Sequence, residues 1–265
     1  KKGDVLAAKK EFALASQIYE SQGAAITAPE RRKKLAMIYM EAGREFLVPK
    51  DAKDPTFIPN HAAAHNLLSK ALDLEALGTE EEAVRANIIE CELKGQFPRP
   101  QLLKTCETFE EKFATSTKLD EVLFAKGTAL RDTGRPWEAQ TAWVRVADGF
   151  ATSKKAPEAL YAAALLYVLE NGETFDVEAL RRGLPLLRRL AKDFASSEQG
   201  PKAALLIGLA LGRYEDLRDD ARKELLAFSE TKHERAAEAL LRVAQLHLED
   251  KDDAKAIATY EDFLK

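Results

Sequence analysis

The sequence predicts an all-α protein, built from tandem helix-turn-helix units that stack into a right-handed superhelical solenoid. Three observations support this prediction. A short tag with an aromatic residue and a serine recurs along the chain, apolar residues follow the period of an α-helix after each tag, and Gly-containing turn signals separate successive helices. These features recur through nearly the whole chain, so we expect one repeat domain over residues 1–265.

The tag gives the length of the repeat. It reads Phe-Ala-Thr-Ser at residues 113–116 and 150–153, and Phe-Ala-Ser-Ser at residues 194–197. The first interval is 37 residues and the second is 44. A helical run follows each tag, and a further run of the same design begins at Glu234. Periods of roughly 20–50 residues are typical of solenoids, in which one unit buries its apolar face only against its neighbours.

Within each unit, the first helix carries an apolar stripe at positions i, i+4 and i+7. The stripe consists of Leu123, Gly127 and Leu130 in one unit, and of Leu160, Ala164 and Tyr167 in the next. Small residues in the stripe let two helix backbones approach closely, and large ones such as Trp143 fill the space beside them. The stripe therefore predicts the side of each helix that faces the stack.

Extending this pattern in both directions gives about six and a half repeats, starting with a second helix around Phe12. Two insertions interrupt it. Residues 44–60 contain three prolines and should not be helical, and residues 171–190 contain Pro185, which should break or kink their helix. The chain begins at Lys1 without a Met and both ends fall within a repeat, so we interpret it as a fragment of a longer chain.

The units resemble tetratricopeptide repeats (TPR). The tag, followed by a helix start such as Ala156-Pro157-Glu158-Ala159-Leu160, is similar to one subgroup, the repeats of bacterial envelope proteins such as the outer-membrane-assembly lipoprotein BamD and the Tol-Pal-associated coordinator proteins. In that subgroup the residue after the aromatic is usually Pro, whereas this chain has Ala at all three tags. The resemblance covers nearly the whole chain and implies a TPR-like solenoid.

A second apolar stripe on the first helices is the candidate partner-binding surface. It consists of Phe124, Tyr161, Leu165, Val168, Leu205 and Leu209. In TPR-like superhelices this side lines the concave groove in which peptides or partner helices dock. The stripe makes the expected helices over 159–169 and 203–211 apolar all round, which is unusual at a surface. The alternative is that the superhelical curvature, or the insertion at 171–190 folding over, buries this side.

The first insertion is too apolar for an ordinary solvent loop. Phe46, Phe57 and Ile58 are therefore candidates for a partner contact, since ordered loops with apolar tips often bind. The alternative, which we favour, is that these side chains pack over the edge of the helix that follows.

Two histidines and two cysteines are residue types that can form metal or redox sites. His61 and His65 lie one helical turn apart, but no third ligand stands at a suitable spacing, so we expect no metal and a helix start with solvated imidazoles. Cys91 and Cys106 fall at apolar helix positions, which favours buried free thiols over a bridge between them.

Charge and motif content narrow the classes of function. The 40 Lys and Arg against 44 Asp and Glu give a net charge of −4, which disfavours nucleic acid as a partner. The basic clusters at residues 31–34 and 181–189 are expected to be solvated faces paired with nearby acids. No apolar run is long enough to span a membrane. We find no phosphate-binding loop or nucleophile elbow, and so expect no catalytic residue, cofactor or small-molecule substrate.

We therefore expect a non-catalytic protein-protein interaction scaffold that binds protein or peptide partners. The resemblance implies one component of a multiprotein bacterial cell-envelope assembly, with the periplasm favoured and the cytoplasm left open. Two alternatives remain: the helical, non-catalytic domain of a cell-wall enzyme of the lytic transglycosylase type, and a purely architectural spacer.

Overall fold

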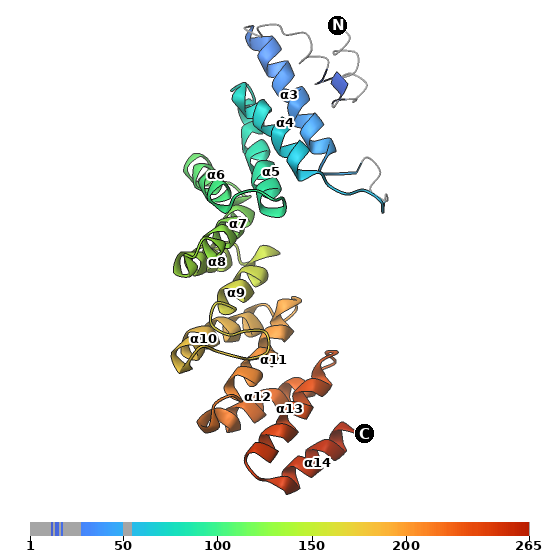
Figure 1. The fold of residues 1–265 in the computed structure, drawn as a ribbon, viewed down its shortest axis with the longest axis vertical. Coiled ribbons are helices and arrows are strands. Elements are labelled where there is room, and N and C mark those ends of the chain that lie inside the picture. Colours follow the sequence, from blue (N-terminus) through green and yellow to red (C-terminus); the bar gives the residue numbers. More distant parts are fainter. Residues whose placement is uncertain (1–11, 13, 16, 18–27, 50–54, 265) are drawn as a thin grey trace. The chain divides into compact units, whose positions relative to one another are not determined.

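The computed structural model describes residues 12, 14, 15, 17, 28–49 and 55–264 (Figure 1). These residues form α-helices joined by turns and short 3-10 helices, with one isolated antiparallel bridge between Val168 and Thr174. Each helix packs mainly against the helices next to it in the chain, as expected of a tandem helical repeat. The predicted all-α repeat solenoid is confirmed.

The helices divide into two compact units, one up to Arg135 and one from Pro136, called the N-unit and the C-unit below. The N-unit contains α3 (Pro29–Glu45), α4 (His61–Asp73), the 3-10 helix η1 (Gly78–Glu80), α5 (Glu81–Lys94), α6 (Arg99–Lys112) and α7 (Leu119–Asp132). Consecutive helices pack together, and α5 also contacts α7. The predicted first helices of neighbouring repeats therefore touch within this unit.

The C-unit contains α8 (Pro136–Gly149), α9 (Lys155–Ala164), α10 (Val177–Asp193), α11 (Gln199–Leu211), the 3-10 helix η2 (Glu215–Leu217), α12 (Arg218–Ser229), α13 (Ala236–Glu249) and α14 (Asp253–Phe263). The same pairing recurs, because α11 contacts both α9 and α13 in addition to its neighbours in the chain. The first helix α11 therefore packs against both neighbouring helices and against the first helices before and after it.

The predicted i, i+4, i+7 stripe is buried. Leu123, Gly127 and Leu130 are buried in the N-unit, and Leu160, Ala164 and Tyr167 in the C-unit. Trp143, on α8, is the largest fully buried side chain among the described residues. Helical periodicity alone thus identified the residues that hold the stack together.

The tag is a turn with a serine cap, and its hydrogen bonds explain why it recurs. At each copy the amide of the tag serine donates to the carbonyl of the tag phenylalanine, over 3.0 Å at Ser116, 2.8 Å at Ser153 and 2.9 Å at Ser197. The serine hydroxyl then accepts an amide of the next helix start, for example the Gly200 amide at 3.0 Å. One tag thus ends one helix and begins the next.

A fourth copy of this turn occurs where the sequence analysis did not identify one. The Thr231 amide donates to the Phe228 carbonyl at 3.0 Å, and the Thr231 hydroxyl accepts the His233 amide at 3.4 Å. Phe228 lies 34 residues after Phe194. The sequence Phe-Ser-Glu-Thr at residues 228–231 differs from the tag at its last three positions, so it was not recognised as a copy. The turn itself needs only the aromatic residue and a hydroxyl three residues later.

The structure corrects the predicted helix over 159–169. α9 ends at Ala164, and residues 165–176 form a hairpin-like turn that we call the 165–176 turn. The Leu169 amide donates to the Glu173 carbonyl at 2.7 Å, beside the Val168–Thr174 bridge. Gly172 closes the turn with a φ of +81°, a conformation that most residues avoid. An apolar composition suits a buried turn as well as a helix, so composition misled the prediction here.

A break or a kink was expected at Pro185; the break is wrong, because α10 is helical from Val177 to Asp193 with Pro185 inside it, and the kink stays a prediction. Pro185 lies on the exposed side of the helix. Water can therefore satisfy the carbonyl that loses its partner one turn earlier, and the helix continues. The predicted insertion at 171–190 is in fact the end of the 165–176 turn followed by an ordinary second helix.

Two remaining expectations concern the amino-terminal region. The half repeat expected around Phe12 lies largely outside the described residues, although the few positions described there are helical. The insertion lies between Glu45, the last residue of α3, and His61, the first residue of α4, and its residues 50–54 lie outside the described residues. No helix among the described residues has the length and apolar character needed to cross a membrane.

Candidate functional site

Two adjoining cavities in the N-unit form a polar groove along α5. Their volumes are about 720 Å³ and about 250 Å³, and Leu72, Asp73 and Arg85 line both. Helix α5 supplies the floor, while α4 and α6 supply the two walls. We call this feature the α5 groove. Its walls come from second helices, whereas the sequence analysis placed the groove on first helices.

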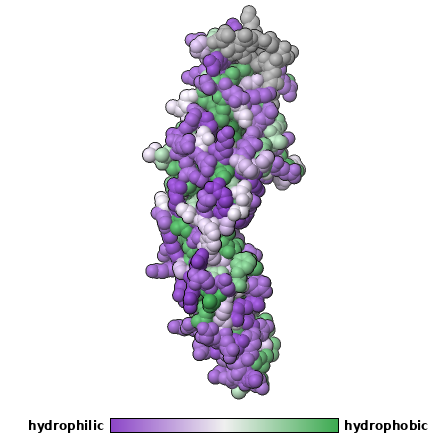
Figure 2. All heavy atoms as spheres, turned by 60° about the vertical axis from the view of Figure 1, so that its left-hand side comes forward, coloured by the Kyte–Doolittle hydropathy of each residue, from purple (hydrophilic) through white to green (hydrophobic). Residues whose placement is uncertain are grey.

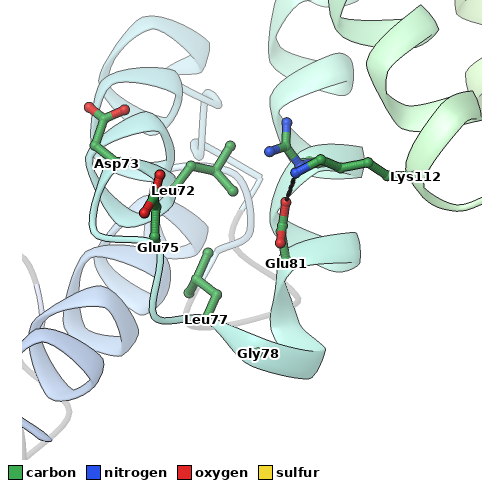
Figure 3. A pocket seen from close by; sticks show the side chains of 8 residues that line it. Leu72, Asp73, Glu75, Leu77, Gly78, Glu81 and Lys112 are labelled. Carbon is green, nitrogen blue, oxygen red and sulfur yellow. Dashed lines mark hydrogen bonds and ion pairs between the residues drawn. The ribbon is translucent and has the colours of Figure 1, made fainter. Parts of the chain in front are cut away.

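In the larger cavity, Lys112 reaches across from α6 to Glu81 on α5, while Leu72 and Leu77 point into the space beside α4 (Figure 3). Glu81 Oε1 accepts hydrogen bonds from Arg85 Nε at 2.7 Å and from Lys112 Nζ at 3.0 Å. Burial of the Glu81 carboxyl opposes its ionisation, but these two cations outweigh that effect and lower its pKa. The larger cavity thus contains a fixed ion cluster beside a small apolar surface.

The smaller cavity is built around Glu92, whose side chain is only 2% exposed. Glu92 Oε1 accepts from Gln101 Nε2 at 2.7 Å and pairs with His65 Nε2 at 3.0 Å. The His65 ring also lies 4.4 Å from the Phe97 ring, centroid to centroid. The expectation of two solvated imidazoles is therefore wrong for His65, because Phe97 and Glu92 hold its ring at the helix interface.

The second carboxylate oxygen of Glu92, Oε2, has an unusual environment. Glu92 Oε2 is buried and has no hydrogen-bond partner among the described residues. Buried polar atoms almost always have a partner, and an unpaired carboxylate oxygen is costly. Glu92 therefore carries an unpaired acceptor that is closed off from solvent.

The rest of the smaller cavity adds hydroxyl groups and a short apolar surface. Thr105 Oγ1 donates to the Gln101 carbonyl at 3.1 Å, and Thr108 Oγ1 donates to the Lys104 carbonyl at 3.0 Å. Their oxygen lone pairs remain able to accept, as does the hydroxyl of Ser69, which lines the same cavity. The lining thus combines several acceptors with the methyl groups of Ile88.

Sequence reasoning missed this site, although one sign of it was present. Val84, Ile88 and Glu92 follow one another at i, i+4 and i+8, and all three are buried. A carboxylate at the third position of a buried stripe is unusual, because charged residues are rarely buried without a partner. That position could have been singled out. Its neighbours on α4 and α6 could not, because their approach depends on how the three helices pack.

The predicted partner-binding stripe falls partly on the surface and partly in the core. Phe124 is half-buried on α7 of the N-unit, and Tyr161, Leu165 and Leu209 are half-buried in the C-unit. Val168 and Leu205 are 0% and 1% exposed, so they belong to the C-unit core and cannot touch a partner directly. The 165–176 turn lies over α11 beside Leu209. Only part of the stripe is therefore accessible.

Charged groups surround the accessible part of the stripe in the C-unit. Burial raises the pKa of the Tyr161 hydroxyl, and the charge and hydrogen bond of Glu170 raise it further, while Arg235 partly offsets both. Arg235 is itself held by Glu238, with Nε 2.6 Å from Oε2. Tyr161 therefore presents a polar tip within a small charged cluster.

On the face seen in Figure 2, hydrophilic side chains predominate and hydrophobic ones form patches between them.

The apolar insertion residues divide in the same way. Phe46 is half-buried against the N-unit core, and its carbonyl accepts the Asn60 amide at 2.9 Å. Phe57 is also half-buried, whereas Ile58 is 85% exposed. The packed alternative therefore describes Phe46, and Ile58 is the member of the set that a partner could reach.

The two cysteines are buried within the fold, and two arginines of the predicted basic stripe are held in ion pairs. Both cysteines are buried free thiols, as favoured from the sequence. Burial, together with the charges of Glu90 and Glu92, raises the pKa of the Cys91 thiol to about 12. In the predicted basic stripe, Arg182 pairs with Glu178 and Arg189 with Asp148, in agreement with a solvated face that carries local ion pairs.

The fold defines a class, a TPR-like helical repeat protein in which consecutive helix pairs stack and first helices touch. The sequence matches no known family profile and no curated protein. Among solved structures, the crystal structure of the yeast Tom70 is similar, with a TM-score of 0.33 and 14% sequence identity over 95% of this chain. This chain spans about half, 54%, of that Tom70 chain. The class assignment rests on the helices of the present structure.

Proposed function

We propose that this chain is a non-catalytic protein-interaction scaffold and that the α5 groove binds a peptide segment of a partner protein. The observation that carries the proposal is the polar lining of a groove of this size. The larger cavity, at about 720 Å³, falls in the size range of ligand sites, roughly 300–1,000 Å³. Small-molecule sites are lined mainly by apolar groups, whereas only Leu72 and Leu77 are large apolar residues here. A peptide backbone suits such a lining better.

The accessible part of the predicted stripe is proposed as a second contact, made by the C-unit. Tyr161, Leu165 and Leu209 would supply apolar anchors, while Glu170 and Arg235 would supply charge selectivity. Phe124 and Ile58 would contribute in the N-unit, as half-buried and exposed apolar side chains respectively. Large interfaces commonly combine apolar anchors with a polar rim in this way.

The cellular setting is proposed from the tag alone. The resemblance of the tag to bacterial envelope repeats supports a role in a cell-envelope assembly, with the periplasm as the favoured compartment. The helical domain of a cell-wall enzyme is the second candidate, and it requires a catalytic domain elsewhere in the full-length protein. A purely architectural spacer is the third, and it would bind no peptide.

Selection of a random peptide library displayed on phage tests the proposal. The chain is immobilised, bound peptides are enriched, and each is measured against Thr105→Arg, which places a large cation on the groove wall. Thr141→Arg is the matched control, because Thr141 lies on α8 and makes the same own-helix hydrogen bond, to the Trp137 carbonyl at 3.0 Å. We expect peptides that bind the unmodified chain and Thr141→Arg but not Thr105→Arg. Failure to enrich any peptide, or equal binding to all three proteins, would contradict the proposal.

A further inference from the structure

We infer that the outward face of α10 is a docking surface for an acidic helix of a partner protein. The surface is built around a row of three cations, Arg181, Arg188 and Lys192, which we call the α10 basic row. The row belongs to the C-unit, so the inference goes beyond the proposed function and does not depend on the α5 groove. Three observations carry it: the spacing of the cations, the shortage of ion pairs at them, and the apolar side chains beside them.

Helical spacing puts the three cations in line. Arg188 and Lys192 follow Arg181 at i+7 and i+11, and positions at this spacing lie on one face of a helix. All three side chains are exposed, and Pro185, which is exposed as well, lies on the same face between the first two. At about 1.5 Å per residue, the row extends along roughly 16 Å of α10. The cations therefore form a continuous strip on one side of the helix.

The two neighbouring arginines differ, because α8 holds them. Arg182 and Arg189 lie about 90° around the helix from the row. The Arg182 guanidinium carbon lies 5.3 Å from the centre of the Trp137 ring on α8. Arg189 Nη1 donates to Asp148 Oδ1, also on α8, at 2.7 Å. These two arginines thus join α10 to α8 within the C-unit, and the basic row does not share this role.

The row itself is largely without acidic partners. Arg181 Nη1 lies 3.9 Å from Glu178 Oε2, a long ion pair, and the Arg181 side chain is 74% exposed. Arg188 and Lys192 form neither an ion pair nor a hydrogen bond in the part of the chain that the structure describes. Like charges one turn apart on a helix repel each other, so this pair does not stabilise α10. The positive charge is therefore available to a partner.

Apolar side chains border the row on the side away from α8. Val177 and Leu184, seven residues apart, lie within about 60° of the row around the helix. Val177 is 41% exposed, and Leu184 is half-buried against the C-unit core. Interfaces commonly place apolar contacts beside charged ones. An amphipathic helix that carries carboxylates next to an apolar stripe would match both features of α10.

The surrounding charges favour a protein helix over a phosphate surface. Glu178 and Asp193 lie near the two ends of the row, and their side chains are 55% and 47% exposed. They would repel a continuous layer of phosphates, such as a membrane surface or a nucleic acid. The row is also confined to one helix of a chain whose net charge is −4. A partner helix carries its charges at separate positions, so its acids can face the three cations and avoid the two carboxylates.

Selection from a phage library of helical peptides, randomised on one face, tests the inference. Peptides enriched on the immobilised chain are measured again on two variants. Arg188→Glu reverses a charge within the row. Lys223→Glu is the matched control, because Lys223 is an exposed cation on α12 of the same unit and the substitution changes the net charge by the same amount.

We expect the enriched peptides to be rich in Asp and Glu and to bind Lys223→Glu as they bind the unmodified chain. They should bind Arg188→Glu about tenfold or more weakly, because an attraction is replaced by a repulsion. Added salt should also weaken binding, since it screens exposed charge pairs. Exchanging a glutamate of the peptide for lysine should restore binding to Arg188→Glu.

Three results would overturn the inference: no enrichment of acidic peptides, equal binding of those peptides to both variants, or preferential binding of phosphate. The last is measured with phosphatidylglycerol vesicles and a short DNA duplex, either of which would have to displace the peptides from the unmodified chain. If Arg188→Glu fails to fold, each selected peptide is compared on the unmodified chain with an analogue in which glutamine replaces its glutamates. Equal binding of the two peptides would again overturn the inference.

This inference and the proposed function can fail separately. Peptides that lose binding to Thr105→Arg but not to Arg188→Glu support the α5 groove alone. Peptides with the opposite dependence support the α10 basic row alone.

Discussion

Gly172 lies directly against Leu209, and a Cβ built on Gly172 would come within 2.7 Å of the Leu209 backbone carbon and Cβ. The contact joins the 165–176 turn to α11 within the C-unit. Thr174 reinforces it through a hydrogen bond between its hydroxyl and that of Tyr214, and Arg213 donates to the Asn171 carbonyl at 3.2 Å. The turn is therefore part of the packed C-unit rather than a loose connection.

Gly172→Ala should destabilise the chain by about 2 kcal/mol or more, because it combines a positive φ with a steric clash. Gly134→Ala is the matched control: Gly134 has a φ of +79°, close to the +81° of Gly172, but nothing lies within 4 Å of its added Cβ. Thermal or urea unfolding of both variants measures the difference. Equal losses of stability would mean that the turn does not pack on α11.

The tag hydroxyl should contribute about 1 kcal/mol at each copy, as helix caps usually do. Ser197→Ala removes the acceptor for the Gly200 amide, and Thr231→Ala removes the acceptor for the His233 amide. Both variants should lower the free energy of unfolding measured in urea. Ser196→Ala, at an exposed neighbouring position, should leave it unchanged. An unchanged free energy of unfolding in Thr231→Ala would show that the Thr231 hydroxyl does not stabilise the helix start in the fourth copy.

The stability of the C-unit should fall as the pH drops below about 6.5, the usual pKa of histidine. Burial lowers the pKa of His247, and the nearby positive charge of Arg222 lowers it further, partly offset by Asp252. Between the lowered folded-state pKa and the unfolded value, the unfolded chain binds a proton that the folded chain does not, so stability decreases with falling pH.

Urea unfolding between pH 8 and pH 5 measures this effect, and His247→Gln should flatten the dependence. Asp250 and Asp252 also have pKa values lowered from the ordinary aspartate value of 3.8. The stability that they contribute is therefore lost only as the pH falls to about that value and below, which is more acidic than the range measured here. An unchanged slope in His247→Gln would assign the dependence to other groups.

Cys91 and Cys106 should resist alkylation in the native protein. Both thiols are buried, and with a pKa of about 12 only roughly one in ten thousand Cys91 side chains is a thiolate at pH 8. Iodoacetamide labelling followed by mass spectrometry should show both cysteines modified only after denaturant is added. Rapid labelling of one cysteine in native buffer would show local opening of α5 or α6.

The sequence was most informative where local rules decide the structure. Leu123, Gly127 and Leu130 were recognised as core because helical periodicity puts them on one face. The tag was recognised because the same turn chemistry recurs at Ser116, Ser153 and Ser197. Such features depend on residues close in the chain, so the pattern alone was sufficient.

Features that depend on distant residues could not be predicted in the same way. The end of α9 at Ala164 depends on Gly172 packing against α11, and an apolar run gives no sign of this. The α5 groove depends on how α4 and α6 stand beside α5, and only Glu92 offered a local sign of it. Periodicity assigns a residue to a face of its own helix, but it does not say what lies opposite that face.

The 165–176 turn accounts for the difference in length between two intervals that separate successive tags. Where that turn is present the interval is 44 residues, and the following interval, which lacks it, is 34. Within the turn the Leu169 amide donates to the Glu173 carbonyl, and Gly172 packs against Leu209 of α11. The turn thus lengthens the repeat and still packs on α11. Phe175, 80% exposed within it, marks a position where a spectroscopic label or an affinity tag could be introduced without disturbing the repeat.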